Sequence, residues 1–323
     1  MRQSPLLSNL DSWPRPANAD RAALGRERWV ERAKRETDAT LKAFALDFAE
    51  SASGRSVLSA VFGSSPYLGD SLLKEMAFFR DLLASDPKDA VEAVRKRLID
   101  EAPAASDDDA LRRLLRVTKR QTALAIALAD IAGFWTVEEV MDALSGFADA
   151  SLAVTVDHLL RRAAEEGNLA PPDPEKPSRD SGFIVFAMGK LGAHELNYSS
   201  DVDLIVLYDG ERTPYCGDQD VQRFFERLTR NLIAILEDRT ADGYAFRTDL
   251  RLRPDPGAMP IALSVTAAEI YYESTGQNWE RAALIKARPV AGDIAAGDAF
   301  LEILRPFLSV SYTHLTLPTI YSV

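Results

Sequence analysis

The sequence predicts two domains, a helical one followed by one in which strands and helices interleave. Apolar residues recur at helical spacing over residues 21–167, and a stretch rich in Pro, Gly and charge follows at 168–182. Beyond it come short runs of β-branched and aromatic residues that are typical of strands. Strands that interleave with helices indicate an α/β or α+β fold for the second domain. A chain of 323 residues is long enough for two domains of ordinary size.

Composition and charge exclude several classes of protein. The net charge of -11 argues against nonspecific attraction to nucleic acid or to an anionic membrane. No apolar run approaches the roughly 20 residues that span a bilayer, and the first twenty residues lack the pattern of a secretory signal. The single cysteine, Cys216, allows no internal disulfide and suits a reducing compartment. We therefore expect a cytoplasmic protein that binds neither membrane nor nucleic acid.

The helical domain, residues 21–167, follows an irregular lead-in at 1–20. Thr136 and Glu139 have the spacing of a capping box that opens a helix. A basic run at helical spacing is expected to form a solvated face, or else to meet an acidic surface on a partner. It comprises Arg112, Arg113, Arg116, Lys119 and Arg120.

The second domain, residues 183–308, should contain three strands and several helices. We expect strands over 183–189, 201–209 and 244–254, and helices over about 218–239, 264–276, 279–290 and 298–308. Trp279, at the start of one of these helices, is expected in the core.

Asp201 and Asp203 stand two apart on the second predicted strand, so both carboxylates project from the same face. Two adjacent carboxylates repel and have raised pKa values unless a cation lies between them, which suggests a Mg²⁺ or Mn²⁺ site. The alternative is a pair of solvated aspartates at the edge of a strand. The preceding loop favours the metal site, because glycines and serines can bring backbone N–H groups and hydroxyls close to a phosphate. These loop residues are Gly189, Gly192, Ser199 and Ser200.

The third predicted strand adds a carboxylate among arginines. Asp249 shares one face there with Arg247, Arg251 and Arg253, and the residues between them form the other, mainly apolar face. An arginine-rich strand beside two carboxylates suits a site for metal and polyphosphate, because arginine binds phosphate bidentately. The alternative is that Asp249 simply pairs with neighbouring arginines on an exposed face.

Several long motifs resemble one family. These are GKLGAHELNYSSDVDLIVLYD, FRTDLRLRPDPGAMPIALS, YYESTGQNWERAALIKARPVAGD and, earlier, GSSPYL. Together they are similar to the bifunctional glutamine synthetase adenylyltransferase/adenylyl-removing enzymes, which are polymerase-beta-like nucleotidyltransferases with two catalytic halves in tandem. The resemblance covers most of residues 25–308, and NYSSD before the two aspartates is closer to the N-terminal, adenylyl-removing half.

The resemblance implies an α+β nucleotidyltransferase domain with a small mixed sheet flanked by helices. It also implies that Asp201, Asp203 and Asp249 bind Mg²⁺ or Mn²⁺ and that Gly189 begins the loop that binds the phosphates of ADP or ATP. Lys190, next in the loop, would hold a phosphate or point to solvent. Further residues in family-like segments would contact the nucleotide, namely Arg251, Arg253, Lys286 and Arg288.

The reaction implied is phosphorolysis of adenylyl-tyrosine on glutamine synthetase, with phosphate consumed and ADP released. Its alternatives are ATP-dependent adenylylation of the same tyrosine, or a non-catalytic fragment that docks on glutamine synthetase or on a PII-type signalling protein. Residues 309–323 depart from the family pattern and lack helical periodicity, so we expect an aberrant tail on a truncated enzyme.

Overall fold

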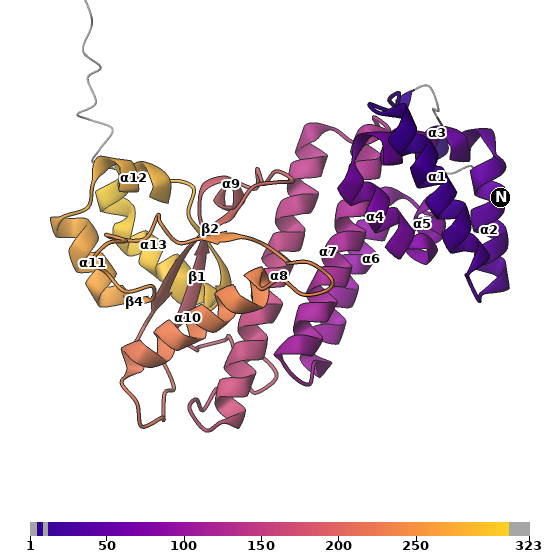
Figure 1. Cartoon of the computed structure of the whole chain (residues 1–323). Helices are drawn as coiled ribbons and strands as arrows, with labels where there is room; N and C mark the ends of the chain where they lie inside the picture. The colour runs from indigo at the N-terminus through magenta and orange to yellow at the C-terminus, as the bar shows by residue number, and fades with distance from the viewer. Residues whose placement is uncertain (1–4, 9–11, 310–323) are drawn as a thin grey trace, which may run out of the picture. The chain divides into compact units, whose positions relative to one another are not determined.

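The chain is described here by a computed structural model that covers residues 5–8 and 12–309 (Figure 1). These residues fold into two compact units. The first comprises the residues up to Asp100 together with Arg116–Phe147, and the second comprises Glu101–Leu115 together with the residues from Ala148 onward. Of the expected tail, only Ser309 lies within the described residues.

The first unit is helical throughout its described residues, and polar side chains fix where several helices begin. The side chains of Asn18, Asp38, Ser51 and Ser65 each accept a hydrogen bond from a backbone N–H in the first turn of the helix that follows. The elements are η1 (Pro5–Leu7), α1 (Ala19–Lys34), α2 (Ala39–Glu50), α3 (Ala52–Ser64), α4 (Pro66–Lys74), α5 (Met76–Leu83) and α6 (Pro87–Glu101).

Two long helices, α7 (Asp108–Ile131) and α8 (Val137–Glu165), contribute to both units. The predicted capping box at the start of α8 is confirmed. The Thr136 N–H donates to the Glu139 carboxylate at 2.9 Å, and the Glu139 N–H donates to the Thr136 hydroxyl at 3.3 Å. The division between the units crosses α7 between Leu115 and Arg116 and α8 between Phe147 and Ala148. The linker expected at 168–182 stays a prediction.

Aromatic side chains fill the core of the first unit around Trp29, which is fully buried. Its ring meets Phe79 edge-on, with 5.8 Å between centroids, and its Nε1 donates to the Ala45 carbonyl at 2.9 Å. The indole is thus buried without leaving its N–H unpaired, which would be costly.

The prediction of a solvated basic face on α7 is wrong for two of its members. Arg116 is only 1% exposed, and the Arg120 guanidinium donates to the Glu75 carboxylate at 2.6 Å. The Gln121 amide donates to the other oxygen of Glu75 at 2.7 Å. The Glu75 and Arg120 side chains are 9% and 11% exposed, so this is a buried ion pair with an additional hydrogen bond.

A small mixed sheet forms the centre of the second unit, as predicted. Its strand order is β3-β2-β1-β5, and β4 also pairs with β2. The β1–β2 and β1–β5 pairs are antiparallel, while β3 and β4 run parallel to β2. The strands are β1 (Phe183–Ala187), β2 (Val202–Tyr208), β3 (Thr248–Asp249), β4 (Leu263–Ser264) and β5 (Arg288–Gly292).

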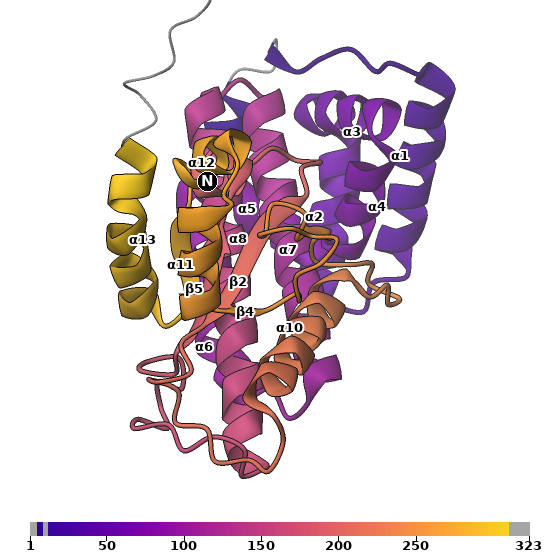
Figure 2. The same cartoon turned by 90° about the vertical axis from the view of Figure 1, so that its left-hand side faces the viewer.

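Helices cover both faces of this sheet (Figure 1, Figure 2). On one face, Phe225 of α10 stacks on Phe183 and Tyr208, with ring centroids 5.5 and 4.7 Å away. On the other face, Phe186 packs against Phe300 of α13, in a core that also includes Tyr272 of α11. The helices of this part are α9 (Gly189–Gly192), α10 (Val221–Glu237), α11 (Val265–Ser274), α12 (Asn278–Leu284) and α13 (Ile294–Ser309).

The structure corrects three expectations in the second unit. The third predicted strand is reduced to Thr248–Asp249, and the helix expected over 279–290 ends at Leu284 and is followed by strand β5. Trp279 is 50% exposed rather than part of the core. Among the helices of the described residues, none combines the length and the apolar character that a bilayer crossing requires.

We expect Arg120→Ala to destabilise the first unit by about 3–5 kcal/mol, because it leaves the buried Glu75 carboxylate without its counterion. The matched control is Arg35→Ala, since Arg35 and Glu31 are 79% and 68% exposed and 3.9 Å apart. That control should cost less than about 1 kcal/mol. Urea unfolding followed by tryptophan fluorescence measures both. Equal effects of the two substitutions would show that Glu75 finds another partner.

Candidate active site

Parallel pairing of β2 with β3 places two aspartates side by side. Asp203 on β2 is the register partner of Asp249 on β3, and Val202 is the partner of Thr248. Register partners in neighbouring strands project from the same face of a sheet. Asp201, two residues before Asp203, precedes the strand on the same side. The three predicted ligands therefore lie at one end of the sheet.

A carboxylate from α10 fixes the short strand β3. The Glu237 side chain accepts hydrogen bonds from both the N–H and the hydroxyl of Thr248, each at 2.6 Å. The Val202 N–H in turn donates to the Arg247 carbonyl at 2.9 Å. Sequence reasoning missed Glu237, since its position as the last residue of an amphipathic helix gives no sign of this contact.

Gly189 brings the chain after β1 into direct contact with Asp203. Its φ of +52° lies in the left-handed region, and a Cβ there would lie 2.6 Å from the Asp203 Oδ2. The Met188 N–H donates to the Asp203 carbonyl at 2.9 Å. Gly189 thus leaves room for the Asp203 carboxylate at the start of α9.

The environment of Asp203 disfavours its charged form. Burial raises the pKa of the Asp203 carboxyl, and the nearby charges of Asp249 and Asp201 raise it further. Arg251 and Lys190 act in the opposite direction on the pKa of Asp203 but do not reverse the shift. This is the repulsion that two adjacent aspartates predict, and the structure adds a third acid to it.

Arginines neutralise the other two carboxylates. The Arg251 Nε donates to both oxygens of Asp249, at 2.8 and 3.0 Å, and the Arg251 N–H donates to one of them at 2.8 Å. The Arg251 guanidinium holds the pKa of the Asp249 carboxyl below its usual range. The Arg247 guanidinium pairs with Asp201 and also donates to the Ser199 carbonyl at 2.9 Å. The alternative that Asp249 pairs with an arginine is therefore realised here, although Arg251 lies in a turn and not on a strand.

The residues present fit a divalent cation in chemistry, because all three candidate ligands are carboxylates at one end of the sheet. Asp203 and Asp249 come from neighbouring strands, and burial, together with the charges of Asp249 and Asp201, raises the pKa of Asp203. In the part of the chain that the structure describes, no three His, Cys, Asp or Glu side chains yet form a group that could hold a metal. Asp201 and Asp249 would have to exchange their arginine partners for the cation.

Among the predicted phosphate-binding residues, the loop members lie next to the carboxylates. The Lys190 Nζ donates to the Ser200 hydroxyl at 3.2 Å, and its charge lowers the pKa of Asp203. Lys190 and Ser199 are exposed, and Ser200 is half-buried. The structure thus brings Lys190, Ser199 and Ser200 to the acidic end of the sheet, and their contact with phosphate stays a prediction.

The other predicted nucleotide contacts have protein partners in this structure. The Arg288 Nη2 donates to Asp149 at 2.8 Å and to the Leu191 carbonyl at 3.0 Å, and Lys286 pairs with Glu195 at 2.9 Å. Gly192 allows the backbone at Lys286, just before β5, to pack closely against α9, because a Cβ at Gly192 would lie 2.1 Å from the Lys286 carbonyl oxygen.

Arg253 has a similar internal role. Its two terminal nitrogens donate to the carbonyls of Leu250 and Pro256, at 2.9 and 2.8 Å. These contacts hold the loop after β3 together. A role for Arg253, Lys286 or Arg288 in binding nucleotide stays a prediction, whereas Arg253 and Arg288 already donate to backbone carbonyls around the site.

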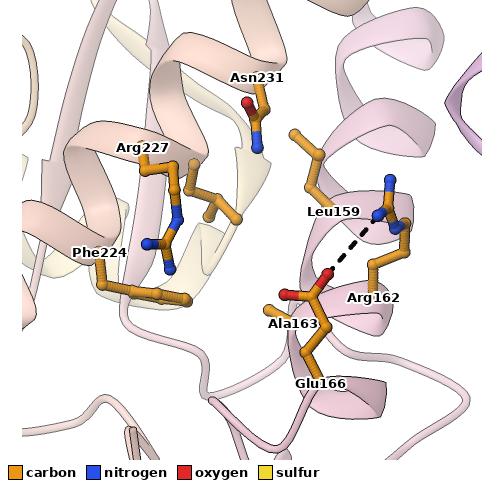
Figure 3. Close-up of a pocket in the computed structure, with 8 residues that line it drawn as sticks. Leu159, Arg162, Ala163, Glu166, Phe224, Arg227 and Asn231 are labelled. Carbon is orange, nitrogen blue, oxygen red and sulfur yellow. Dashed lines mark ion pairs between the residues drawn. The ribbon is translucent and has the colours of Figure 1, made fainter. Parts of the chain in front are cut away.

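A cavity of about 40 Å³ lies elsewhere in the second unit, between α8 and α10 (Figure 3). Arg227 and Phe224 face Arg162 and Glu166 across it, with the Arg227 guanidinium 5.7 Å from the centre of the Phe224 ring. Arg162 pairs with Glu166 at 3.5 Å and with Asp108, so its charge is already balanced. No predicted site residue lines this cavity, and we place the candidate active site at the carboxylates instead.

The mixed sheet with its carboxylates on adjacent parallel strands, flanked by helices, is a nucleotidyltransferase domain. The model of the glutamate-ammonia ligase adenylyltransferase family matches residues 56–303. The chain belongs to this family, which is a family of nucleotidyltransferases.

Curated relatives agree. The bifunctional glutamine synthetase adenylyltransferase/adenylyl-removing enzyme of Rhizobium meliloti (strain 1021) is 48% identical over 260 residues, which are 79% of this chain and 26% of the relative. The enzyme of the same name from Bradyrhizobium sp. (strain ORS 278) is 44% identical over 306 residues, 95% of this chain and 31% of the relative. The chain thus spans between a quarter and a third of the length of these relatives.

Asp203→Asn should raise the stability of the metal-free protein, and the gain should grow with pH. Because the folded-state pKa of Asp203 is raised above its usual 3.8, the folded protein holds this proton more tightly than the unfolded chain. Ionisation of Asp203 therefore lowers the free energy of unfolding as pH rises from the unfolded-state pKa through the folded-state pKa. Asparagine does not ionise, so the variant does not lose this stability. Urea unfolding in EDTA from about pH 4.5 to 7.5 tests this. Asp298→Asn, at an exposed position on α13, is the control. A gap between variant and parent that does not change with pH would contradict the raised pKa.

Gly189→Ala should reduce activity far more than stability. The left-handed backbone costs alanine about 1–2 kcal/mol, while its Cβ would displace the Asp203 carboxylate that it meets at 2.6 Å. Displacing a catalytic group by about 1 Å can cost on the order of 100-fold in rate. Gly210→Ala is the control, since a Cβ there meets only Tyr208, at 3.8 Å. Turnover measures the effect on activity, and the urea midpoint measures the effect on stability. A loss of turnover no larger than the loss of stability explains would assign Gly189 a purely structural role.

Proposed function

We propose that this chain removes AMP from adenylyl-tyrosine of glutamine synthetase by phosphorolysis. The single observation that carries the proposal is the pairing of Asp203 with Asp249 on adjacent strands, with Asp201 and two arginines beside them. Carboxylates next to cationic side chains suit a reaction at a phosphorus atom, where charge accumulates on oxygen. The name of the relatives includes an adenylyl-removing activity on glutamine synthetase, which is the chemistry proposed for this chain.

In the proposed reaction an oxygen of inorganic phosphate attacks the phosphorus of the adenylyl group. The bond from that phosphorus to the tyrosine oxygen breaks, ADP forms, and the phenolate takes up a proton to give tyrosine. Phosphate is already an anion at neutral pH and needs no protein base to activate it. Tyrosine, with a pKa of about 10, is an acceptable leaving group when positive charge stabilises it.

The chain's own residues have distinct parts in this proposal. Asp201, Asp203 and Asp249 would hold Mg²⁺ or Mn²⁺, which when bound supplies positive charge to the phosphorus oxygens and to the leaving oxygen. Lys190 and Ser200, which contact each other beside Asp203, would bind phosphate oxygens. Arg247 and Arg251 are exposed and have the planar geometry that binds phosphate.

ATP-dependent adenylylation of the same tyrosine is the second candidate. The name of the relatives covers both activities, and both directions pass through a similar five-coordinate phosphorus. The resemblance of NYSSD, which ends at Asp201, to the adenylyl-removing half favours the removing direction. Binding of a PII-type protein stays a prediction from the family resemblance.

The deciding experiment incubates the chain with fully adenylylated glutamine synthetase, Mg²⁺ and inorganic phosphate. We expect ADP to accumulate in step with loss of AMP from the tyrosine. The intact mass of the synthetase measures that loss. Unmodified synthetase with ATP forms the second arm. Adenylylation in the second arm, with no ADP in the first, would reverse the proposed direction.

Asp249→Asn should lower the rate by at least about 100-fold, because it removes a carboxylate that would hold the cation. Asp298→Asn changes the charge equally at an exposed position and should leave the rate unchanged. Rates come from ADP release at saturating Mg²⁺. Near-normal turnover of Asp249→Asn would show that Asp249 is not a cation ligand.

A further inference from the structure

The two arginines at the site are bound differently from the arginines that hold the fold together. The Arg247 and Arg251 side chains are 57% and 84% exposed, and their guanidinium groups contact Asp201 and Asp249. The Arg288 side chain is only 23% exposed and binds two backbone carbonyls besides an aspartate. Because both guanidinium groups are exposed, solvent or a phosphate can reach them, although the Asp249 side chain is only 13% exposed and Arg247 also donates to the Ser199 carbonyl.

These contacts occupy the atoms that a cation would need. Arg251 donates to both oxygens of Asp249, whose side chain is only 13% exposed, and Arg247 donates to Asp201. Within the described residues, no arginine donates a hydrogen bond to the Asp203 carboxylate, and the nearby Arg251 and Lys190 offset its charge only in part. Two of the three carboxylates are therefore paired with exposed arginines, and the third is left to attract a cation.

We propose that Arg247 and Arg251 are exchangeable counterions of this site. Without a divalent cation they neutralise Asp201 and Asp249. When these carboxylates turn to a cation, both guanidinium groups are released and bind the phosphate groups of the nucleotide. The inference rests on the proposed function, since it takes the carboxylates as cation ligands.

The exchange couples two binding events. Since cation and arginine compete for the same oxygen atoms, each arginine contact weakens cation binding. Since an arginine paired with a carboxylate is unavailable to phosphate, the cation strengthens nucleotide binding by releasing it. By thermodynamic reciprocity the nucleotide then strengthens cation binding by the same factor. An arginine that only stabilised the loop would affect both ligands in the same direction.

The test uses Arg251→Gln. Its affinity for Mn²⁺, measured from the electron paramagnetic resonance of the free ion without nucleotide, should rise about two- to fivefold, the range that an exposed ion pair supports. Its affinity for ADP in the presence of Mn²⁺, measured by calorimetry, should fall. The factor by which Mn²⁺ strengthens ADP binding should shrink as well.

Arg230→Gln is the matched control. It removes the same charge from an arginine of α10 that is 61% exposed and pairs with the 18% exposed Glu226, not with a site carboxylate. A gain in Mn²⁺ affinity as large as that of Arg251→Gln would show a general effect of charge and would overturn the exchange. Unchanged Mn²⁺ affinity in Arg251→Gln, or loss of affinity for both ligands, would overturn it too.

Asp203→Asn separates this inference from the proposed function. If Asp203→Asn binds Mn²⁺ as well as the parent chain does, or if neither binds it, there is no cation site at these carboxylates. The proposed function and the exchange are then both wrong. If that site exists and Arg251→Gln leaves it unchanged, only the exchange fails.

Discussion

The candidate site depends on one pairing, the parallel register that sets Asp203 beside Asp249. Each acid belongs to a different stretch of chain, and α10 must complete its crossover before β3 can align with β2. The negative charges of the two adjacent aspartates oppose this pairing of the strands. The packing of α10 on the sheet and the hydrogen bond from the Thr248 N–H to the Glu237 carboxylate stabilise the pairing against that repulsion. The fold thus maintains an electrostatically unfavourable arrangement, as is common where a protein binds a cation.

Much of the fold could be predicted because its signals are local. The buried strands around Phe183 and Leu204, the amphipathic helix α10 and the capping box at Thr136 all follow from spacing within a few residues. The parts that escaped prediction depend on distant partners. Arg120 is buried because Glu75, 45 positions away, neutralises it, and Trp279 is exposed on a helix that ends at Leu284.

The site divides in the same way. The positions of Asp201 and Asp203 follow from strand alternation, and the long motifs that the chain shares with its family pointed to Asp249. The predicted row of arginines beside Asp249 assumed a longer strand than β3, and Arg251 instead turns back onto that aspartate. Periodicity cannot reveal where a strand stops when its last residues lack neighbours to pair with. It also cannot reveal a contact such as that of Arg288 with Asp149, which joins two segments 139 positions apart.

The edges of the sheet have a consequence for the behaviour of the chain in solution. At one end β3 is two residues long, and at the other β5 contains Pro289, paired in register with Phe186. Proline has no N–H to donate, and a short strand offers few free groups to a second chain. Within the described residues, neither end of the β3-β2-β1-β5 order therefore presents a long row of unpaired backbone groups. Sheet-to-sheet self-association, a common route to insoluble aggregates, is disfavoured by the same strand lengths that shape the site.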